Sequence, residues 1–256
     1  MLHALPGPPE GGQPMPPGLV ESDPSAYIGG AMPQTIHVFD AYGTLFDVHS
    51  AIARSGAELG DRAARVSEIW RAKTLEYTWI LTLTGKTAAF RRLLKQALDH
   101  ALAATGAEVS TETREALLAA YDNLAAFPEV KEALLALRKL RSRVAILSNG
   151  DGDLLDMAVR AAGLEDLLDG VLSASEVGVF KPSGRVYRLA MTKFGAQREE
   201  ITFVSSNRWD VAGAQAFGYK TVWVNRSGAP DEYPELPAAH VVPDLRALAS
   251  LMAAKP

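Results

Sequence analysis

Cysteine is absent from this chain of 256 residues. Its absence excludes disulfide bonds, thiolate zinc sites, iron–sulfur clusters and a cysteine nucleophile. The sequence also lacks an apolar run long enough to span a bilayer. Basic residues are not in excess, with 26 Lys and Arg against 30 Asp and Glu, so nucleic acid and anionic membranes are poor candidates for the main partner. A cytoplasmic location fits these absences, and we expect one.

Hydrophobic residues make up 48% of the chain and charged residues 22%, which is enough apolar material for a large core. Residues 1–34 differ from the rest because they hold eight of the 15 prolines and six glycines. Such a segment has too few apolar residues to offset the entropy lost on ordering. We interpret it as a disordered extension, with Met32 as a natural first residue; the alternative is a proline-rich arm that docks on a partner.

After this extension, short apolar segments rich in β-branched residues alternate with segments of helical period. The predicted strands are residues 36–39, 143–147, 171–172, 201–204 and 221–224. Strands of this kind separated by helices indicate a parallel sheet covered on both faces. We therefore predict an α/β fold, a Rossmann-like, doubly wound parallel sheet.

Residues 48–128 interrupt the alternation, because they contain helical patterns and no convincing strand. We predict three or four helices there, inserted directly after the first strand. The expected organisation is a core of residues 35–47 and 129–256 with an all-helical second domain of residues 48–128. A cleft is expected between the two.

Polar residues follow several of the predicted strands. Asp40 follows the first strand, Ser148 and Asn149 the second, Lys181 lies in a later loop, and residues 205–210 follow the fourth strand. Each position alone has an ordinary explanation, since Asp commonly caps helices and Lys-Pro is a common surface turn. In a parallel sheet, however, reactive groups collect at the carboxyl ends of the strands. Four such positions in one sheet therefore predict a site.

These positions carry a family resemblance. Residues 39–45 (FDAYGTL) resemble the first motif of the haloacid dehalogenase superfamily, 148–150 (SNG) the second, Lys181-Pro182 the third and 204–210 (VSSNRWD) the fourth. The helical insertion resembles the cap domain of that superfamily. Four motifs in order over residues 35 to about 250 form a specific signal.

Two departures separate the chain from the phosphatases that dominate the superfamily. Tyr42 stands where phosphatases carry the Asp that protonates the leaving alkoxide, and a halide leaves without a proton. Ser205 replaces an acidic ligand of Mg²⁺. The resemblance therefore favours a dehalogenase that needs no cofactor and no metal. The alternatives are a metal-dependent phosphatase acting on a small phosphate ester, and a catalytically silent relative that only binds.

Further residues resemble the L-2-haloacid dehalogenase branch. Arg71 and Leu75 lie four residues apart, on one face of a predicted helix of the cap. Phe90, Tyr187 and Trp209 fall where the branch has active-site aromatics, although Phe90 and Tyr187 also suit a hydrophobic core. Ala72 stands where close relatives often have Gln, and we expect that difference to affect substrate preference.

The resemblance implies a reaction and a set of roles. A short L-2-haloalkanoic acid is hydrolysed to the D-2-hydroxy acid, with inversion at C2, through an ester on Asp40. The implied catalytic residues are Asp40, Thr44, Arg71, Ser148, Lys181, Tyr187, Ser205, Asn207 and Asp210, and the implied substrate-binding residues are Tyr42, Leu75, Phe90, Asn149 and Trp209. The implied partners are the 2-haloacid, the halide ion and a second copy of the chain in a homodimer.

Overall fold

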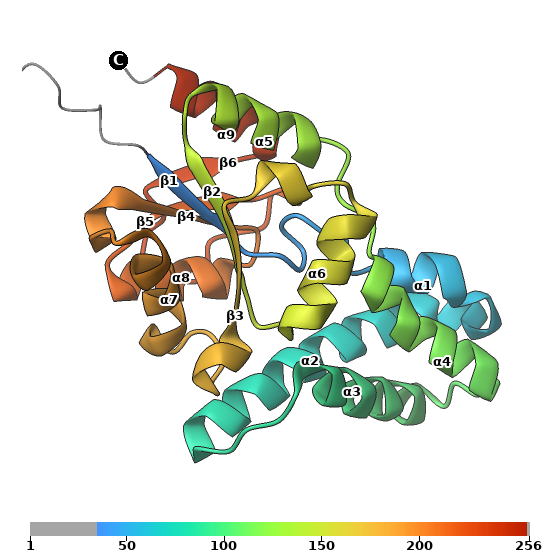
Figure 1. The fold of residues 1–256 in the computed structure, drawn as a ribbon. Coiled ribbons are helices and arrows are strands. Elements are labelled where there is room, and N and C mark those ends of the chain that lie inside the picture. Colours follow the sequence, from blue (N-terminus) through green and yellow to red (C-terminus); the bar gives the residue numbers. More distant parts are fainter. Residues whose placement is uncertain (1–34, 255–256) are drawn as a thin grey trace, which may run out of the picture. The chain divides into compact units, whose positions relative to one another are not determined.

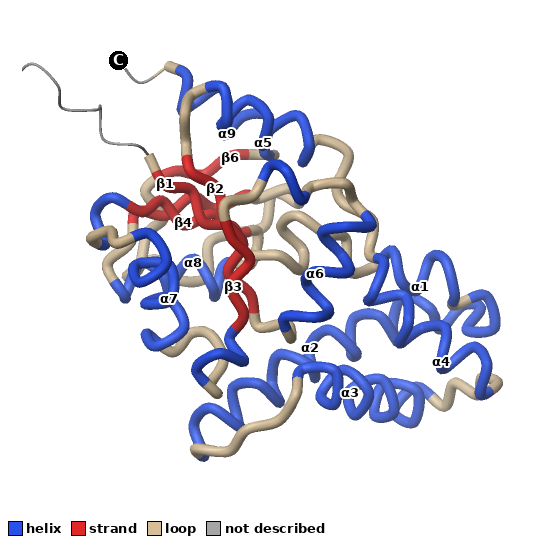
Figure 2. The backbone as a smooth tube through the Cα atoms, in the orientation of Figure 1, coloured by secondary structure: helices blue, strands red, loops and turns tan. Residues whose placement is uncertain are grey.

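A computed structural model describes residues 35–254 of the chain. The predicted disordered extension, residues 1–34, lies outside the described residues. The described part contains a parallel six-stranded sheet in the order β3-β2-β1-β4-β5-β6 (Figures 1 and 2). The strands are β1 (Ile36–Phe39), β2 (Arg143–Ser148), β3 (Gly170–Ser173), β4 (Ile201–Ser205), β5 (Lys220–Val224) and β6 (His240–Val242). The predicted α/β fold is confirmed.

The central strands form because their side chains are apolar on both faces. All four residues of β1 are buried, as are five of the six in β2. Helices cover both faces of such a sheet. The helices of this part are α5 (Val130–Lys139), α6 (Gly152–Ala161), α7 (Gly184–Phe194), α8 (Arg208–Phe217) and α9 (Leu245–Ala253). Helices α5 and α9 pack together on one side of the sheet, and α7 and α8 pack together on the other (Figure 1).

The five predicted strands are present, and the structure adds a sixth that the sequence did not predict. Strand β6 is three residues long and pairs with β5 at the edge of the sheet. Its central residue, Val241, is 58% exposed, so the strand lacks the buried apolar run by which the others were found. A short edge strand leaves little signal in a sequence.

Helices fill the insertion between β1 and α5. They are α1 (Ser50–Ser55), α2 (Ala63–Thr84), α3 (Phe90–Thr105) and α4 (Thr111–Ala119), with short 3₁₀ segments at Ala57–Arg62 and Ala120–Asn123. Figure 1 shows α2 and α3, the two longest helices of the insertion, packed along each other. Trp70 of α2 is buried, and its Nε1 donates to the carbonyl oxygen of Leu94 in α3 at 2.9 Å. The described residues belong to one contact unit, so a separate domain of residues 48–128 stays a prediction.

The segments that join core and insertion are tied to each other. The amide of Asp47 donates to the carbonyl oxygen of Ala125 at 2.8 Å, and the amide of Phe127 donates to that of Leu45 at 3.0 Å. The outgoing and returning chains therefore run together beside the turn that follows β1. Within residues 35–254, no helix is both long and apolar enough to cross a bilayer.

Candidate active site

Asp40 lies directly after β1 and is 5% exposed. One carboxylate oxygen, Oδ1, accepts from Lys181 Nζ at 3.1 Å. The other, Oδ2, accepts from Asn207 Nδ2 at 2.7 Å and from Thr44 Oγ1 at 3.1 Å, with Ser205 Oγ at 3.5 Å. Asn207 and Ser205 belong to the segment at the end of β4, the strand that pairs with β1. The sheet thus brings the first and fourth motifs onto one carboxylate.

Lys181 is fully buried and connects two carboxylates. Its Nζ donates to Asp210 Oδ2 at 2.7 Å as well as to Asp40. A buried ammonium is tolerable only when it is paired, and here the pairing is double. Burial raises the pKa of Asp210 to about 6, against the opposing attraction of Lys181, while the charge of Asp40 adds to the rise.

Tyr187 supports Asp210 from the other side. Its hydroxyl donates to Asp210 Oδ1 at 2.7 Å. Burial and then the adjacent carboxylate raise the pKa of Tyr187 well above its ordinary value, so the phenol keeps its proton and acts as a donor. Helix α8 lies so close to this hydroxyl that a Cβ at Gly213 would be 2.6 Å from the hydroxyl oxygen. A glycine is required at position 213, because any side chain there would overlap the hydroxyl of Tyr187.

Arg71 is the residue of the insertion that brings a charged side chain to the site. From α2, its Nη2 donates to the carbonyl oxygen of Tyr42 and to Asn207 Oδ1, both at 3.1 Å. Asn207 therefore has one end on Arg71 and the other on Asp40. A cation from the insertion is thereby connected to the buried charges of the core through one carboxamide.

Tyr42 and Phe90 form the aromatic part of the site. Their rings stack at 5.5 Å with an angle of 9°. Burial raises the pKa of Tyr42, and its hydroxyl has no hydrogen-bond partner among the described residues. The core also fixes the start of α3, because the Asp151 carboxylate accepts from the amides of Phe90 and Arg91, each at 2.9 Å. A carboxylate at a helix N-terminus is stabilising, and here it holds Phe90 over Tyr42.

The remaining predicted residues line the edges of this arrangement. Ser148 is fully buried at the end of β2, and its Oγ accepts from the amide of Gly150 at 3.2 Å. Asn149 Oδ1 accepts from the amide of Lys181 at 2.8 Å, which fixes the loop that carries this lysine. Leu75 is half-buried on α2, and Trp209 is half-buried on α8. Within residues 35–254, no hydrogen bond joins the side chain of Ser148 or Trp209 to the network around Asp40.

The structure adds a positioning pair that the sequence analysis missed. Arg226, two residues after β5, donates to Glu129 Oε1 at 2.7 Å, to the Thr44 carbonyl oxygen at 3.0 Å and to Ser206 Oγ at 2.6 Å. Glu129 is buried and lies just before α5. This ion pair connects the turn that carries Thr44 to the end of β4 and to the segment that returns from the insertion. The available signal was the place of Arg226 at the carboxyl edge of the sheet, two residues after a predicted strand.

The chain matches known proteins over most of its length. Residues 36–218 match the family described as haloacid dehalogenase-like hydrolase. The chain is 43% identical to (S)-2-haloacid dehalogenase 4A of Burkholderia cepacia, over 84% of this chain and 94% of that protein. It is 41% identical to (S)-2-haloacid dehalogenase 1 of Pseudomonas sp. (strain CBS-3), over 84% and 95%. An L-2-haloacid dehalogenase from Xanthobacter autotrophicus, solved with chloropropionic acid covalently bound, is 33% identical with a TM-score of 0.77, over 87% and 100%.

Proposed function

The chain belongs to the haloacid dehalogenase-like hydrolases, and we propose that it hydrolyses short (S)-2-haloalkanoic acids to (R)-2-hydroxy acids. The observation that carries the proposal is the fully buried Lys181, bound between Asp40 and Asp210. This arrangement holds one carboxylate for attack on the substrate and a second for the water that follows. Curated relatives that are about 40% identical bear the name (S)-2-haloacid dehalogenase.

In the first step, an oxygen of Asp40 attacks C2 on the side opposite the halogen. The C2–halogen bond breaks as the new O–C2 bond forms, the bonding pair leaves with the halide, and C2 is inverted. Asn207 and Thr44 keep the carboxylate at a fixed angle through their bonds to Oδ2. The reacting atoms are then held close together, which removes much of the entropic cost of the step.

Charge balance explains the basic residues. Asp40, Asp210 and the substrate carboxylate bring three negative charges together, and the halide carries one away. Lys181 and Arg71 supply two positive charges that make this assembly tolerable. For the halide we assign Arg71, Asn149 and Trp209, whose indole N–H is buried without a partner among the described residues. Ser148 and backbone amides near Tyr42 bind the substrate carboxylate, and Leu75, Phe90 and the Tyr42 ring bound its alkyl group.

In the second step, water attacks the carbonyl carbon of the Asp40 ester. Asp210 accepts a proton from this water, the acyl C–O bond breaks, and the 2-hydroxy acid takes a proton as it leaves. Tyr187 holds Asp210 by one oxygen and Lys181 by the other, so the carboxylate is aimed and does not rotate. Asn207, Ser205 and Thr44 contact Oδ2, which is the carbonyl oxygen of the ester, and they stabilise the negative charge that develops on it.

The finer predictions stand beside this function. We expect a cytoplasmic homodimer, as the resemblance to the branch implied. The chemistry above uses groups of the chain and water alone, so we expect turnover without a cofactor or a metal.

The test is halide release from L- and D-2-chloropropionate with excess chelator present. The proposal requires chloride from the L acid alone, unaffected by the chelator, and D-lactate as the product. Release of phosphate from small phosphate esters that depends on Mg²⁺, with no chloride from either acid, would contradict it and favour the phosphatase.

A further inference from the structure

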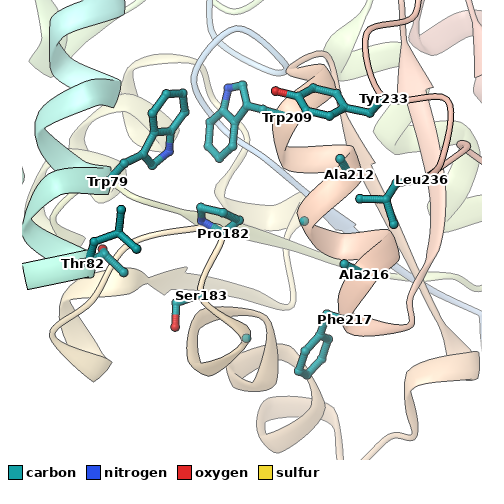
Figure 3. A pocket seen from close by; sticks show the side chains of 13 residues that line it. Trp79, Thr82, Pro182, Ser183, Trp209, Ala212, Ala216, Phe217, Tyr233 and Leu236 are labelled. Atoms are coloured by element: carbon teal, nitrogen blue, oxygen red, sulfur yellow. The ribbon is translucent and has the colours of Figure 1, made fainter. Parts of the chain in front are cut away.

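An apolar pocket of about 860 Å³ opens beside the site, between the end of α2, the start of α7, helix α8 and the segment around Tyr233 (Figure 3). Its lining contains no charged side chain, and Trp79, Pro182, Trp209, Ala216, Phe217 and Leu236 are among the residues that form it. Burying a charged group in such surroundings is costly, whereas an alkyl chain is favoured. The pocket therefore suits hydrocarbon and not a second anionic group.

Two residues of the pocket wall are chain neighbours of reacting groups. Pro182 follows Lys181, and Trp209 precedes Asp210, so each wall residue is the chain neighbour of a buried charge. On α2, Arg71, Leu75 and Trp79 are spaced four apart and therefore follow one face of the helix. Arg71 reaches Asn207 at one end of this row, and Trp79 contacts Trp209 at the other. The row thus runs from the reacting groups to the pocket.

Two indoles contact each other in the wall of the pocket. Figure 3 shows Trp79 on α2 facing Trp209 on α8, and their ring centroids lie 5.5 Å apart in an edge-on arrangement of 76°. The Nε1 atoms of both rings are inaccessible to solvent. The side chain of Asp40 is 7% exposed, that of Lys181 is 1% exposed, and neither residue lines the pocket. The pocket is therefore distinct from the reacting charges, and the indole contact joins α2 to α8 at the residue that precedes Asp210.

We propose that Trp79 sets the longest alkyl group that the site accepts on C2, and that the pocket is an alkyl subsite closed off by this indole. The proposal rests on the proposed function. The alkyl group of the substrate is assigned to Leu75, the middle residue of this row, so an alkyl group that extends past Leu75 along α2 reaches Trp79. A smaller side chain at position 79 connects the pocket with the space that holds the alkyl group of the substrate.

The test compares (S)-2-bromopropionate with (S)-2-bromohexanoate, which share a leaving group and differ in chain length. The quantity is the ratio of kcat/KM for hexanoate to that for propionate. Trp79→Ala should raise this ratio roughly tenfold or more, the value typical of extra methylenes in a hydrophobic pocket. Trp79→Phe should raise it less, because most of the ring remains.

Two further variants test whether the change in the kcat/KM ratio arises from this pocket. Ala216→Trp fills the pocket from α8, so adding it to Trp79→Ala should return the ratio towards that of the parent. Ile80→Ala is the matched control, since Ile80 follows Trp79 on α2, is 53% exposed and does not line this pocket. It should leave the ratio unchanged.

The outcomes separate this proposal from the function on which it rests. Bromide release from propionate by the parent, with an unchanged ratio in active Trp79 variants, overturns the proposal alone. Failure of the parent to release bromide from either acid contradicts the proposed function and this proposal with it. If Trp79→Ala loses its helical circular dichroism, the ratio measured with Trp79→Phe and Trp79→Leu decides, because both keep an apolar side chain at the position.

Discussion

The two parts of the site differ in chemical character. The core contributes buried charges and their partners, with Lys181 between Asp40 and Asp210. The insertion contributes Phe90 and one cation, Arg71, at the rim. We therefore expect the core to supply the groups that react at C2 and at the ester, and the insertion to supply one halide donor and part of the space for the alkyl group.

The largest expected effect is in the core. Asp40→Asn should lower halide release by roughly 10³-fold or more, because a neutral amide is a far weaker nucleophile than a carboxylate. The measurement is initial-rate chloride release from L-2-chloropropionate, with the mass of the variant checked for deamidation back to Asp. Asp61→Asn, an exposed position in the insertion, is the control for loss of one negative charge. Full activity in the Asp40 variant would exclude covalent attack by this residue.

A smaller effect is expected from the insertion. Arg71→Ala should lower kcat on the order of a hundredfold, the typical cost of losing one donor at a developing charge. Arg71→Lys keeps the charge but loses the forked geometry of the guanidinium, so its kcat should lie between that of the parent and that of Arg71→Ala. Circular dichroism and the melting temperature report whether the fold is kept. Equal activity in all three proteins would reduce Arg71 to a surface charge and leave the insertion with an apolar role alone.

The pH dependence tests the buried carboxylates of the core. Because Asp210 has a pKa of about 6, the ionised form needed for ester hydrolysis is lost as pH falls below that value. We expect kcat to fall about tenfold per unit well below pH 6. Tyr187→Phe removes a hydrogen bond that lowers this pKa, so the midpoint should move to higher pH.

Stability should respond to pH in the opposite direction at this residue. A carboxyl whose pKa is raised in the folded state contributes stability that is full below its unfolded value and is lost as pH rises through about 6. The contribution of Asp210 therefore increases as the rate falls. Melting temperatures measured at each pH separate the two effects, and a fall in rate that only follows unfolding would contradict the assignment.

The smallest effect on the rate is expected where core and insertion join. Arg226→Ala leaves the buried Glu129 unpaired, so the free energy of unfolding should decrease by about 3 kcal/mol. Loss of its bond to the Thr44 carbonyl oxygen should lower kcat severalfold with little change in KM. Arg226→Lys should lose less of the free energy of unfolding and less of kcat than Arg226→Ala does. A change in stability with no change in kcat would make Arg226 a purely structural residue.

The charged part of the site was predictable and its supports were not. Asp40, Asn149 and Ser205 stand at or directly after strand ends, and a parallel sheet necessarily brings such ends to one edge. The Arg226–Glu129 pair joins residues 97 positions apart, and Asp151 caps a helix 61 positions away. Contacts of this kind depend on how the helices and loops pack around the sheet. The edge-on contact of Trp79 with Trp209 has the same origin, because the spacing on α2 fixes a face but not what lies opposite it.

The most direct test of the account is the fate of the Asp40 ester in Asp210→Asn. Displacement of the halide needs Asp40 and the halide donors, whereas hydrolysis of the ester needs the carboxylate of Asp210. The variant, incubated with L-2-chloropropionate, should therefore release chloride in at most one turnover per site and retain the lactyl ester on the peptide that contains Asp40, detected by mass spectrometry. In the parent, ¹⁸O from solvent should enter Asp40 during turnover. Normal turnover by the variant, or ¹⁸O in the product with none in Asp40, would contradict attack on the ester and favour direct attack of water on C2.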